Sequence, residues 1–269
     1  RTSWSADVSL DDPSTGTRLM PVEDDALLIG VAGRMSSSLL RLGDNSACEH
    51  GGERGRVHVK RKVLNRLPHD WTGYAGLDLL VLYDPDWNRL TVHQSRAIAD
   101  WVTNGGRLLI VLGTRPLPAS GRIAELVPFR PGPLRQIKIP ASALSAWGFG
   151  RAVANAGAEV SCWPLDGAAK AGWAADGGKS SFFAYGPVAF GKVAVLGFDP
   201  YLLVRRTGGP AAPGRPYLGA QPARSASELA RFWTAQLRHV LGPRQIRHEP
   251  GGGGGDPDYA YYGGFELGR

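Results

Sequence analysis

Apolar and polar positions form their clearest pattern between residues 77 and 113, where they predict two strands. Leu77 to Tyr83 and Arg107 to Leu112 are short runs in which nearly every residue is apolar. Such runs are typical of strands that are covered on both faces, as in a parallel sheet. Asp84-Pro85 ends the first strand and Gly113 ends the second.

The segment between these two strands is predicted to be a helix, because it carries a signal at each end. Thr91 and Gln94 match a capping box, T-x-x-Q, and Asn104-Gly105-Gly106 favours a left-handed helix end. One face of this helix is apolar and consists of Leu90, Ala97, Ile98, Trp101 and Val102. Strand, helix and strand of this size form a βαβ unit, which places the chain in the α/β class.

Further strands are predicted on both sides of this unit. Ala26 to Ala32 is a buried strand, Asp44 to Gly55 is a polar, glycine-containing loop, and Arg56 to Leu64 alternates like a strand near a sheet edge. Later strands are punctuated by glycine and proline, which indicates antiparallel additions to the sheet and not more βαβ units. These later strands are Leu134 to Ile139, Val160 to Pro164, Ser180 to Tyr185 and Lys192 to Gly197.

Four more helices are predicted. Three are short and span Met35 to Leu42, Gly121 to Leu126 and Ala141 to Trp147. The fourth is long, begins at a capping box of Ser225 and Glu228, and ends at Gly242-Pro243.

The predicted domain organisation has three parts. Residues 1–24 are a polar, irregular segment that leads into the fold, and residues 25–242 form the α/β domain. Thr207 to Gln221 is predicted to be a surface loop within that domain. Residues 243–269 include a run of glycines and are predicted to be a flexible tail or linker by composition.

Charge and hydropathy narrow the function classes. The formal net charge is +7, but no Lys/Arg block is interleaved with aromatic residues, so nucleic-acid binding is not expected. The longest apolar runs are of strand length, far below the roughly 20 residues of a membrane span. No signal peptide is visible. However, the chain opens on Arg1 and ends in a loose tail, so we expect it to be a fragment of a longer protein.

Three segments together resemble a known family. They are "Leu-Pro-x-x-Trp-x-x-Tyr-x-x-Leu-Asp" over Leu67 to Asp78, "Leu-Thr-x-x-Gln-x-x-Ala-Ile-x-x-Trp-Val-x-x-Gly-Gly-Arg-Leu" over Leu90 to Leu108, and "Gly-Lys-Val-x-x-Leu-Gly-Phe-Asp-Pro" over Gly191 to Pro200. Residues 24–242 thereby resemble the class I glutamine amidotransferase-like domains of bacterial membrane-anchored proteins.

This resemblance implies a fold and a location. The expected fold is a flavodoxin-like three-layer sandwich with a mostly parallel central sheet, to which the glycine-punctuated strands add antiparallel pairs in the C-terminal half. The expected location is membrane-associated, with the soluble domain extracytoplasmic (periplasmic) and a transmembrane segment outside this fragment. A cytoplasmic location stays open.

The same resemblance bears on catalysis. Active members of the superfamily use a cysteine on a tight strand-to-helix elbow, with a His and a Glu later in the chain. Here Gly113 or Thr114 occupies the expected cysteine position, and no G-x-C-x-G or G-x-S-x-G motif occurs there. Neither Cys48 nor Cys162 lies at such a strand-to-helix elbow. We therefore predict a non-catalytic member, a pseudoenzyme without catalytic residues.

A candidate ligand site lies where the two strands of the βαβ unit end, because open α/β sheets bind ligands at the carboxyl ends of their strands. An arginine beside carboxylates suits a polar ligand, and it equally suits a surface ion pair. The candidate residues are Asp84, Asp86 and Trp87 after the first strand, and Gly113, Thr114 and Arg115 after the second.

No metal or cofactor is predicted. Cys48-x-His50 with His58 matches no standard zinc spacing and lacks a fourth ligand. Two cysteines do not fix a redox compartment, and whether Cys48 and Cys162 pair stays open.

Three functions are compatible with these patterns. The first hypothesis is a non-catalytic amidotransferase-like ectodomain that senses a small polar ligand or assembles with a protein partner at a membrane. The second is a hydrolase that acts at the strand-end cleft with Asp84 or Asp86. The third is a basic module that binds an anionic polymer.

Overall fold

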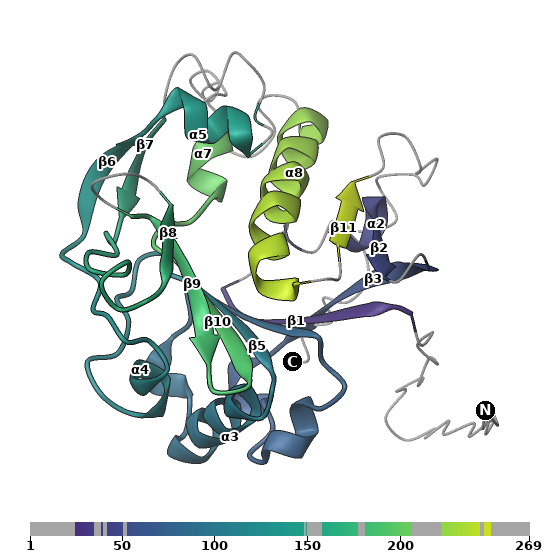
Figure 1. Ribbon diagram of the computed structural model, residues 1–269, viewed down its shortest axis with the longest axis vertical. Coiled ribbons are helices and arrows are strands. Elements are labelled where there is room, and N and C mark those ends of the chain that lie inside the picture. Colours follow the sequence, from purple (N-terminus) through teal and green to yellow (C-terminus); the bar gives the residue numbers. More distant parts are fainter. Residues whose placement is uncertain are drawn as a thin grey trace, which may run out of the picture.

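The computed structural model describes residues 25–34, 39, 42–50, 53–147, 149, 158–176, 181–205, 222–242 and 245–248. The strands of its large central sheet are β1 Leu27–Gly33, β2 Ser46–His50, β3 Glu53–Lys62, β4 Leu79–Tyr83, β5 Arg107–Val111, β8 Ala174–Asp176, β9 Phe183–Val188, β10 Gly191–Leu196 and β11 Gln245–His248. These nine strands lie in the order β11-β2-β3-β1-β4-β5-β10-β9-β8 (Figure 1).

The central sheet has a parallel middle and antiparallel edges. Strands β3, β1, β4, β5 and β10 pair in parallel. Antiparallel pairing adds β9 and β8 beyond β10, and it adds β2 and β11 beyond β3. Of the strands predicted in the C-terminal half, the one at Ser180 to Tyr185 is an antiparallel addition, as β9, whereas the one at Lys192 to Gly197 pairs in parallel, as β10. The sheet also has an antiparallel edge at its other end.

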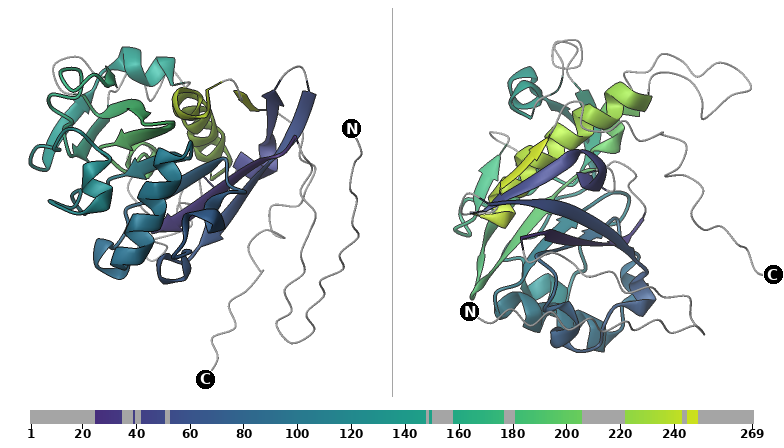
Figure 2. Two further views of the ribbon diagram at one scale, coloured as in Figure 1. Left: turned by 60° about the horizontal axis from the view of Figure 1, so that its bottom comes forward. Right: turned by 90° about the vertical axis from the view of Figure 1, so that its right-hand side faces the viewer.

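Helices lie on both faces of this sheet, as the views of Figures 1 and 2 show, with α8 on one face and α3 and α4 on the other. The helices are α2 Leu42–Asn45, α3 Val92–Thr103, α4 Arg122–Glu125, α5 Ala141–Ala146, α7 Tyr201–Arg205 and α8 Pro222–Leu241, with 3-10 turns η1 Leu64–Arg66, η2 Trp71–Tyr74 and η3 Trp87–Arg89. The molecule is thus a mixed α/β fold. A separate two-stranded antiparallel sheet pairs β6 Arg135–Ile139 with β7 Ala158–Cys162.

Two hydrophobic cores, one on each face of the sheet, explain the apolar runs in the sequence. On β4, Val81 and Tyr83 pack into the core that contains Trp233 of α8. Leu80 and Leu82 point the other way, into the core that contains Ile98, Trp101 and Val102 of α3. Every residue of β4 is buried, because successive side chains of a strand enter opposite cores.

Both predicted ends of α3 are confirmed. The Gln94 amide donates to Thr91 Oγ1 over 3.2 Å, and the Thr91 amide donates to Gln94 Oε1 over 3.0 Å, which completes the capping box. Gly105 has φ 112°, a conformation that suits glycine. The Gln94 side chain is also buried, where its Nε2 donates to the carbonyl oxygens of Leu64 and Leu67.

Several sequence-based assignments are wrong in this structure. The predicted loop from Asp44 to Gly55 contains β2 and the start of β3, and its Ala47 and Cys48 are buried. Residues 245–248, assigned to the flexible tail, form β11 beside β2. Both strands are short and polar, so only their pairing with other segments identifies them. The long helix predicted to begin at Ser225 begins at Pro222, so Ser225 is not its N-cap. The short helix α7 and the short strand β8 were not predicted.

Several predicted features lie outside the described residues. They are the leading segment 1–24, most of the helix predicted from Met35 to Leu42, the loop from Thr207 to Gln221, the side chain of Ser225, and residues 249–269. Among the helices that the structure describes, none is both long and apolar enough to cross a membrane.

Candidate functional site

Asp84 is the centre of the candidate site. It follows β4 directly, and its φ of 38° lies in the left-handed region that few residues other than glycine adopt. Such a conformation costs on the order of 1–3 kcal/mol, so the surrounding contacts must hold it. The Asp84 side chain is only 1% exposed, which keeps its carboxylate away from bulk water.

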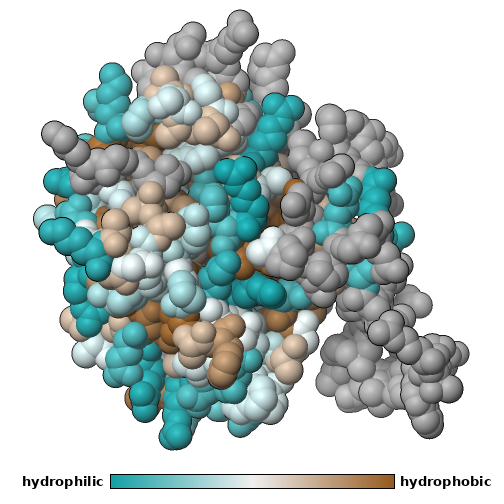
Figure 3. Space-filling model, viewed as in Figure 1, coloured by the Kyte–Doolittle hydropathy of each residue, from teal (hydrophilic) through white to brown (hydrophobic). Residues whose placement is uncertain are grey.

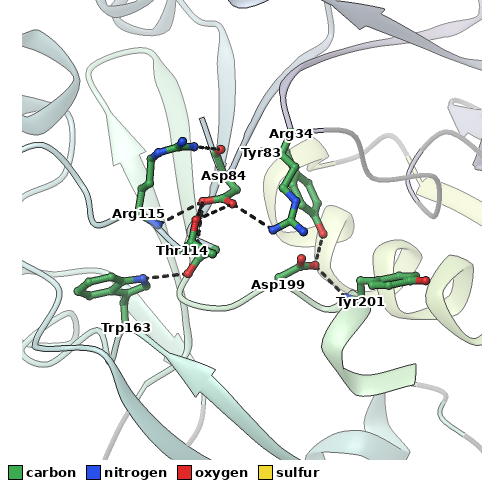
Figure 4. Close-up of polar contacts among 9 residues, drawn as sticks. Arg34, Tyr83, Asp84, Thr114, Arg115, Trp163, Asp199 and Tyr201 are labelled. Carbon is green, nitrogen blue, oxygen red and sulfur yellow. Dashed lines mark hydrogen bonds and ion pairs between the residues drawn. The ribbon is translucent and has the colours of Figure 1, made fainter. Parts of the chain in front are cut away.

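The Asp84 carboxylate joins the end of β4 to the loop that follows β5. Its Oδ1 accepts hydrogen bonds from the backbone amides of Thr114, at 2.8 Å, and Arg115, at 3.2 Å. The Thr114 hydroxyl lies 3.1 Å from Oδ2 (Figure 4). We call Asp84, Thr114 and the Arg115 backbone the Asp84 clamp. Hydrogen bonds from backbone amides stabilise an ionised carboxylate, so the clamp compensates for its burial.

Two arginines flank the clamp. Arg34 follows β1, and its Nη1 lies 3.5 Å from Asp84 Oδ2, while its side chain stays 59% exposed. Arg115 Nη1 donates to the Asp84 backbone carbonyl over 3.5 Å. The arginine predicted to pair with carboxylates therefore contacts a carbonyl oxygen, and the ion pair is made instead by Arg34, which the sequence analysis did not select.

Gly113 packs against the same carboxylate. A Cβ atom at this position would lie 2.6 Å from Asp84 Cγ, which is closer than real Cβ contacts allow. The Gly113 carbonyl oxygen accepts a hydrogen bond from Trp163 Nε1 over 3.1 Å. The Asp84 side chain thus occupies the space that any side chain at position 113 would need.

A surface cavity of about 350 Å³ opens beside the clamp, at the ends of β1, β3 and β4. Cations dominate its lining, with five against two carboxylates, so the cavity has the charge of an anion site. The charged lining residues are Arg34, Arg61, Lys62, Arg89 and Arg115, together with Asp84 and Asp86.

The position of this cavity in the sheet is that of a ligand site. Strand β1 lies between β3 and β4, so the chain builds the sheet first on one side of β1 and then on the other. Crevices outside the carboxyl ends of strands at such a switch point are where open α/β sheets bind ligands. Gly33 and Arg34, at the end of β1, line the cavity.

The structure brings the predicted site residues together only in part. Asp84, Asp86 and Arg115 line the cavity. Gly113 and Thr114 lie behind it in the packing of the Asp84 clamp, and Trp87 Nε1 donates to the Pro116 carbonyl over 2.7 Å. Sequence reasoning missed four cavity cations: Arg34 follows β1, Arg61 and Lys62 are the last residues of β3, and Arg89 lies in η3. The available signal was their position at or near the ends of predicted strands.

A second buried aspartate lies on the α8 side of the sheet. The Tyr83 hydroxyl donates to Asp199 Oδ1, and the Tyr201 amide donates to the same oxygen over 3.0 Å (Figure 4). Because Tyr83 ends β4 and Asp199 follows β10, this contact links two strand ends across β5. It lies outside the cavity lining.

The cysteines are buried structural residues. No disulfide joins Cys48 and Cys162. Burial raises the pKa of the Cys162 thiol to about 12, so this thiol stays protonated near neutral pH and is a poor nucleophile. Among the residues that the structure describes, no cluster of three His, Cys, Asp or Glu side chains is placed to hold a metal ion.

Comparisons with known proteins identify no family for this chain. No family model matches it, and no curated protein matches it. Two cytoplasmic proteins, from Salmonella typhimurium LT2 and Salmonella typhimurium, are similar in structure at 14% and 11% identity with TM-scores of 0.42 and 0.44. They align over 79% and 80% of this chain and 98% of their own chains.

A third structure with a similar fold is the exo-beta-1,4-mannosidase of Opitutaceae bacterium strain TAV5. It is 15% identical, has a TM-score of 0.43, and aligns over 79% of this chain and 36% of its own. Likeness at this level does not assign a function.

Proposed function

We propose that this chain is a non-catalytic, amidotransferase-like binding domain that takes up a small anionic ligand in the cavity beside Asp84. The observation that carries the proposal is the cavity lining, in which five cations and two carboxylates meet at the strand ends. Arginine guanidinium groups bind phosphate and carboxylate groups bidentately. The ligand class is therefore a small molecule that bears a phosphate or several carboxylates.

The strand order supports the flavodoxin-like part of the proposal. The parallel strands lie in the order β3-β1-β4-β5-β10, which corresponds to 2-1-3-4-5 when parallel strands alone are numbered. Flavodoxin-like sheets have this order, and their ligand binds where β1 meets the third strand. In this chain that position is the β1–β4 boundary, where Gly33, Arg34 and Asp84 meet at the cavity.

The surroundings of Gly113 support the absence of amidotransferase chemistry. A nucleophile at this position would need a side chain, and the Asp84 carboxylate fills that space. An elbow also needs a helix that begins directly after the nucleophile, so that its amides face the reacting carbonyl. Here the next helix, α4, begins only at Arg122, and the Thr114 and Arg115 amides bind Asp84.

The hydrolase hypothesis finds less support. Asp84 is buried and saturated with hydrogen-bond donors, so it is badly placed to activate a water molecule. Asp86, which is half-buried in the cavity lining, would have to act without it. A binding role requires no such activation and uses the cavity cations directly.

The resemblance also motivates a proposed setting. We propose that the domain is attached to a bacterial membrane through a segment outside these 269 residues and that it operates on the extracytoplasmic side. There it would pass ligand occupancy to a protein partner. The complete gene product tests this setting, because an apolar segment of roughly 20 residues next to the domain supports it and a soluble chain at both ends overturns it.

Ligand binding is tested with inorganic phosphate, pyrophosphate and citrate as probes. At a ligand concentration of about 100 Kd, a bound anion should stabilise the fold by about 2.7 kcal/mol, which thermal unfolding detects. Arg61→Ala with Arg89→Ala removes two cavity cations outside the Asp84 clamp. We expect this variant to lose roughly 100-fold or more in affinity by calorimetry, since each of the two lost charge-assisted hydrogen bonds contributes about 1.5–3 kcal/mol.

A matched control separates the cavity from general surface charge. Arg96→Ala removes an exposed arginine that pairs with Asp100 on α3, and Arg122→Ala removes one that pairs with Glu125 on α4. The double control should bind each probe like the parent protein. Equal affinity of the cavity variant and this control would overturn the proposal, as would a failure of all three probes to bind.

A further inference from the structure

A row of exposed cations runs along β3 toward the cavity. Val57 and Val59 of β3 face the core beneath α8, so residues of the opposite parity face the other side of the sheet. Arg56, Lys60 and Lys62 are exposed on that side, and His58 between them is half-buried. We call Arg56, Lys60 and Lys62 the β3 row.

The β3 row is continuous with the cavity, because Lys62 belongs to both. Alternate residues of a strand lie about 6.8 Å apart, so the row extends roughly 20 Å from Arg56 to Lys62. A surface with cations in a line and a cationic cavity at its end matches a ligand with anions in a line. A compact anion would use the cavity alone.

Among the residues that the structure describes, the neighbouring strands place no acidic residue in register with the β3 row. On β1, the residues in register with His58, Lys60 and Lys62 are Leu28, Gly30 and Ala32. On β2, the residue in register with Arg56 is Ala47. One step further along, Arg54 is in register with the acidic Glu49, so the cations without an acidic residue in register begin at Arg56.

We propose that the β3 row and the cavity form one track for a linear polymer of phosphate groups, with the end of the polymer in the cavity. The inference rests on the proposed function only in that the cavity holds the terminal anion. Exposed lysine and arginine side chains bind such a chain through its charges and release its counterions.

The absence of stacking surfaces favours a phosphate chain over a single-stranded nucleic acid. Proteins that bind single strands without sequence preference combine a basic groove with aromatic rings on which the bases stack. The described cavity lining contains no aromatic side chain, and in the row only the half-buried His58 has a ring. Figure 3 shows one face of the molecule, where hydrophilic residues separate small hydrophobic patches.

Chain-length dependence tests the track. We compare pyrophosphate, which fits the cavity alone, with long-chain inorganic polyphosphate, which also reaches the row. The double variant Arg56→Glu with Lys60→Glu reverses the charge of the two row residues that lie outside the cavity. We expect this variant to bind long polyphosphate about 10-fold or more weakly and to lower its salt slope by about 2, roughly one for each lost contact, with pyrophosphate binding unchanged. Arg122→Glu with Lys170→Glu, both exposed elsewhere, is the matched control.

The outcomes separate this inference from the proposed function. Equal polyphosphate binding by the row variant and its control overturns the track, whatever pyrophosphate does. Loss of pyrophosphate binding only in Arg61→Ala with Arg89→Ala supports the cavity site by itself. A single-stranded oligonucleotide of equal charge that binds as tightly as polyphosphate, with the same dependence on Arg56 and Lys60, overturns the phosphate-chain class in favour of nucleic acid.

Discussion

An aromatic-Asp-Pro sequence occurs at the ends of two core strands, and its aspartate makes different contacts at each. Tyr83-Asp84-Pro85 begins at the last residue of β4 and Phe198-Asp199-Pro200 follows β10, and both aspartates are buried. Asp84 accepts backbone amides from the loop after β5 and lies beside a cationic cavity. Asp199 accepts the Tyr83 hydroxyl and the Tyr201 amide beneath α7 and α8.

The comparison shows that the tertiary contacts of such an aspartate, and not the sequence motif, determine its role. Aspartate and proline end strands well, so the motif by itself explains only where β4 and β10 stop. The left-handed backbone marks Asp84 as the position held under strain, while Asp199 has no such mark. Asp84 contacts Arg34 and Arg115 beside the cationic cavity, and Asp199 links the ends of β4 and β10.

The largest expected effect comes from filling the space beside Asp84. Gly113→Ala should lower the free energy of unfolding by about 3 kcal/mol, because the new Cβ would collide with Asp84 Cγ. Denaturant unfolding measures the change. Gly76→Ala is the control, since no atom lies within 4 Å of a Cβ built there. Similar losses in the two variants would show that the clamp is not tightly packed.

The next prediction compares the two aspartates directly. Asp84→Asn should cost about 2 kcal/mol, because an amide nitrogen would replace the oxygen that faces Arg34 and the Thr114 hydroxyl. Asp199→Asn should cost about 1 kcal/mol or less, because the retained oxygen can accept from both Tyr83 and Tyr201. Equal losses in denaturant unfolding would remove the distinction between the two strand ends.

A third prediction concerns the link between the strand ends. Tyr83→Phe should cost about 1 kcal/mol, the usual net value of one buried hydrogen bond. A double-mutant cycle with Asp199→Ala, which removes the accepting oxygen, should show coupling between the two side chains, because they contact each other. Strictly additive losses would show that the hydroxyl contributes nothing through Asp199.

The smallest expected effect is a pH dependence of the folding stability that Cys162 causes. This residue lies in the same core as Tyr83 and Phe198. Cys162 has a folded-state pKa of about 12 against a reference value of 9.0, so above pH 9 the unfolded chain loses this proton first. Stability should therefore be constant with respect to this group below pH 9 and fall as the pH rises toward 12. Between pH 8 and pH 9.5 the loss should be about 1 kcal/mol at most. Cys162→Ala should flatten the curve, and an unchanged slope would contradict the prediction.

Local sequence signals predicted the features whose causes are local. The capping box of α3 needs only Thr91 and Gln94, and the burial of β4 on both faces follows from its unbroken apolar run. Asp84, Asp86 and Arg115 were found because two predicted strands end beside them.

The features that sequence reasoning missed depend on pairing between distant segments. β2 and β11 are polar strands whose identity comes from each other and from β3. Arg34 and Arg61 reach the cavity only because β1 lies between β3 and β4, an order that no local pattern specifies. The close approach of Gly113 to Asp84 is likewise a product of tertiary packing.

The pairing of β11 with β2 has a consequence for how the molecule assembles. It joins Gln245 to Glu49, about 200 residues apart in the sequence, and closing so long a loop costs more entropy than forming the βαβ unit of β4, α3 and β5. We expect the parallel middle of the sheet to fold first and β11 to dock last. Until β11 docks, β2 presents its unpaired backbone edge to other chains, so slow docking exposes the protein to edge-to-edge aggregation.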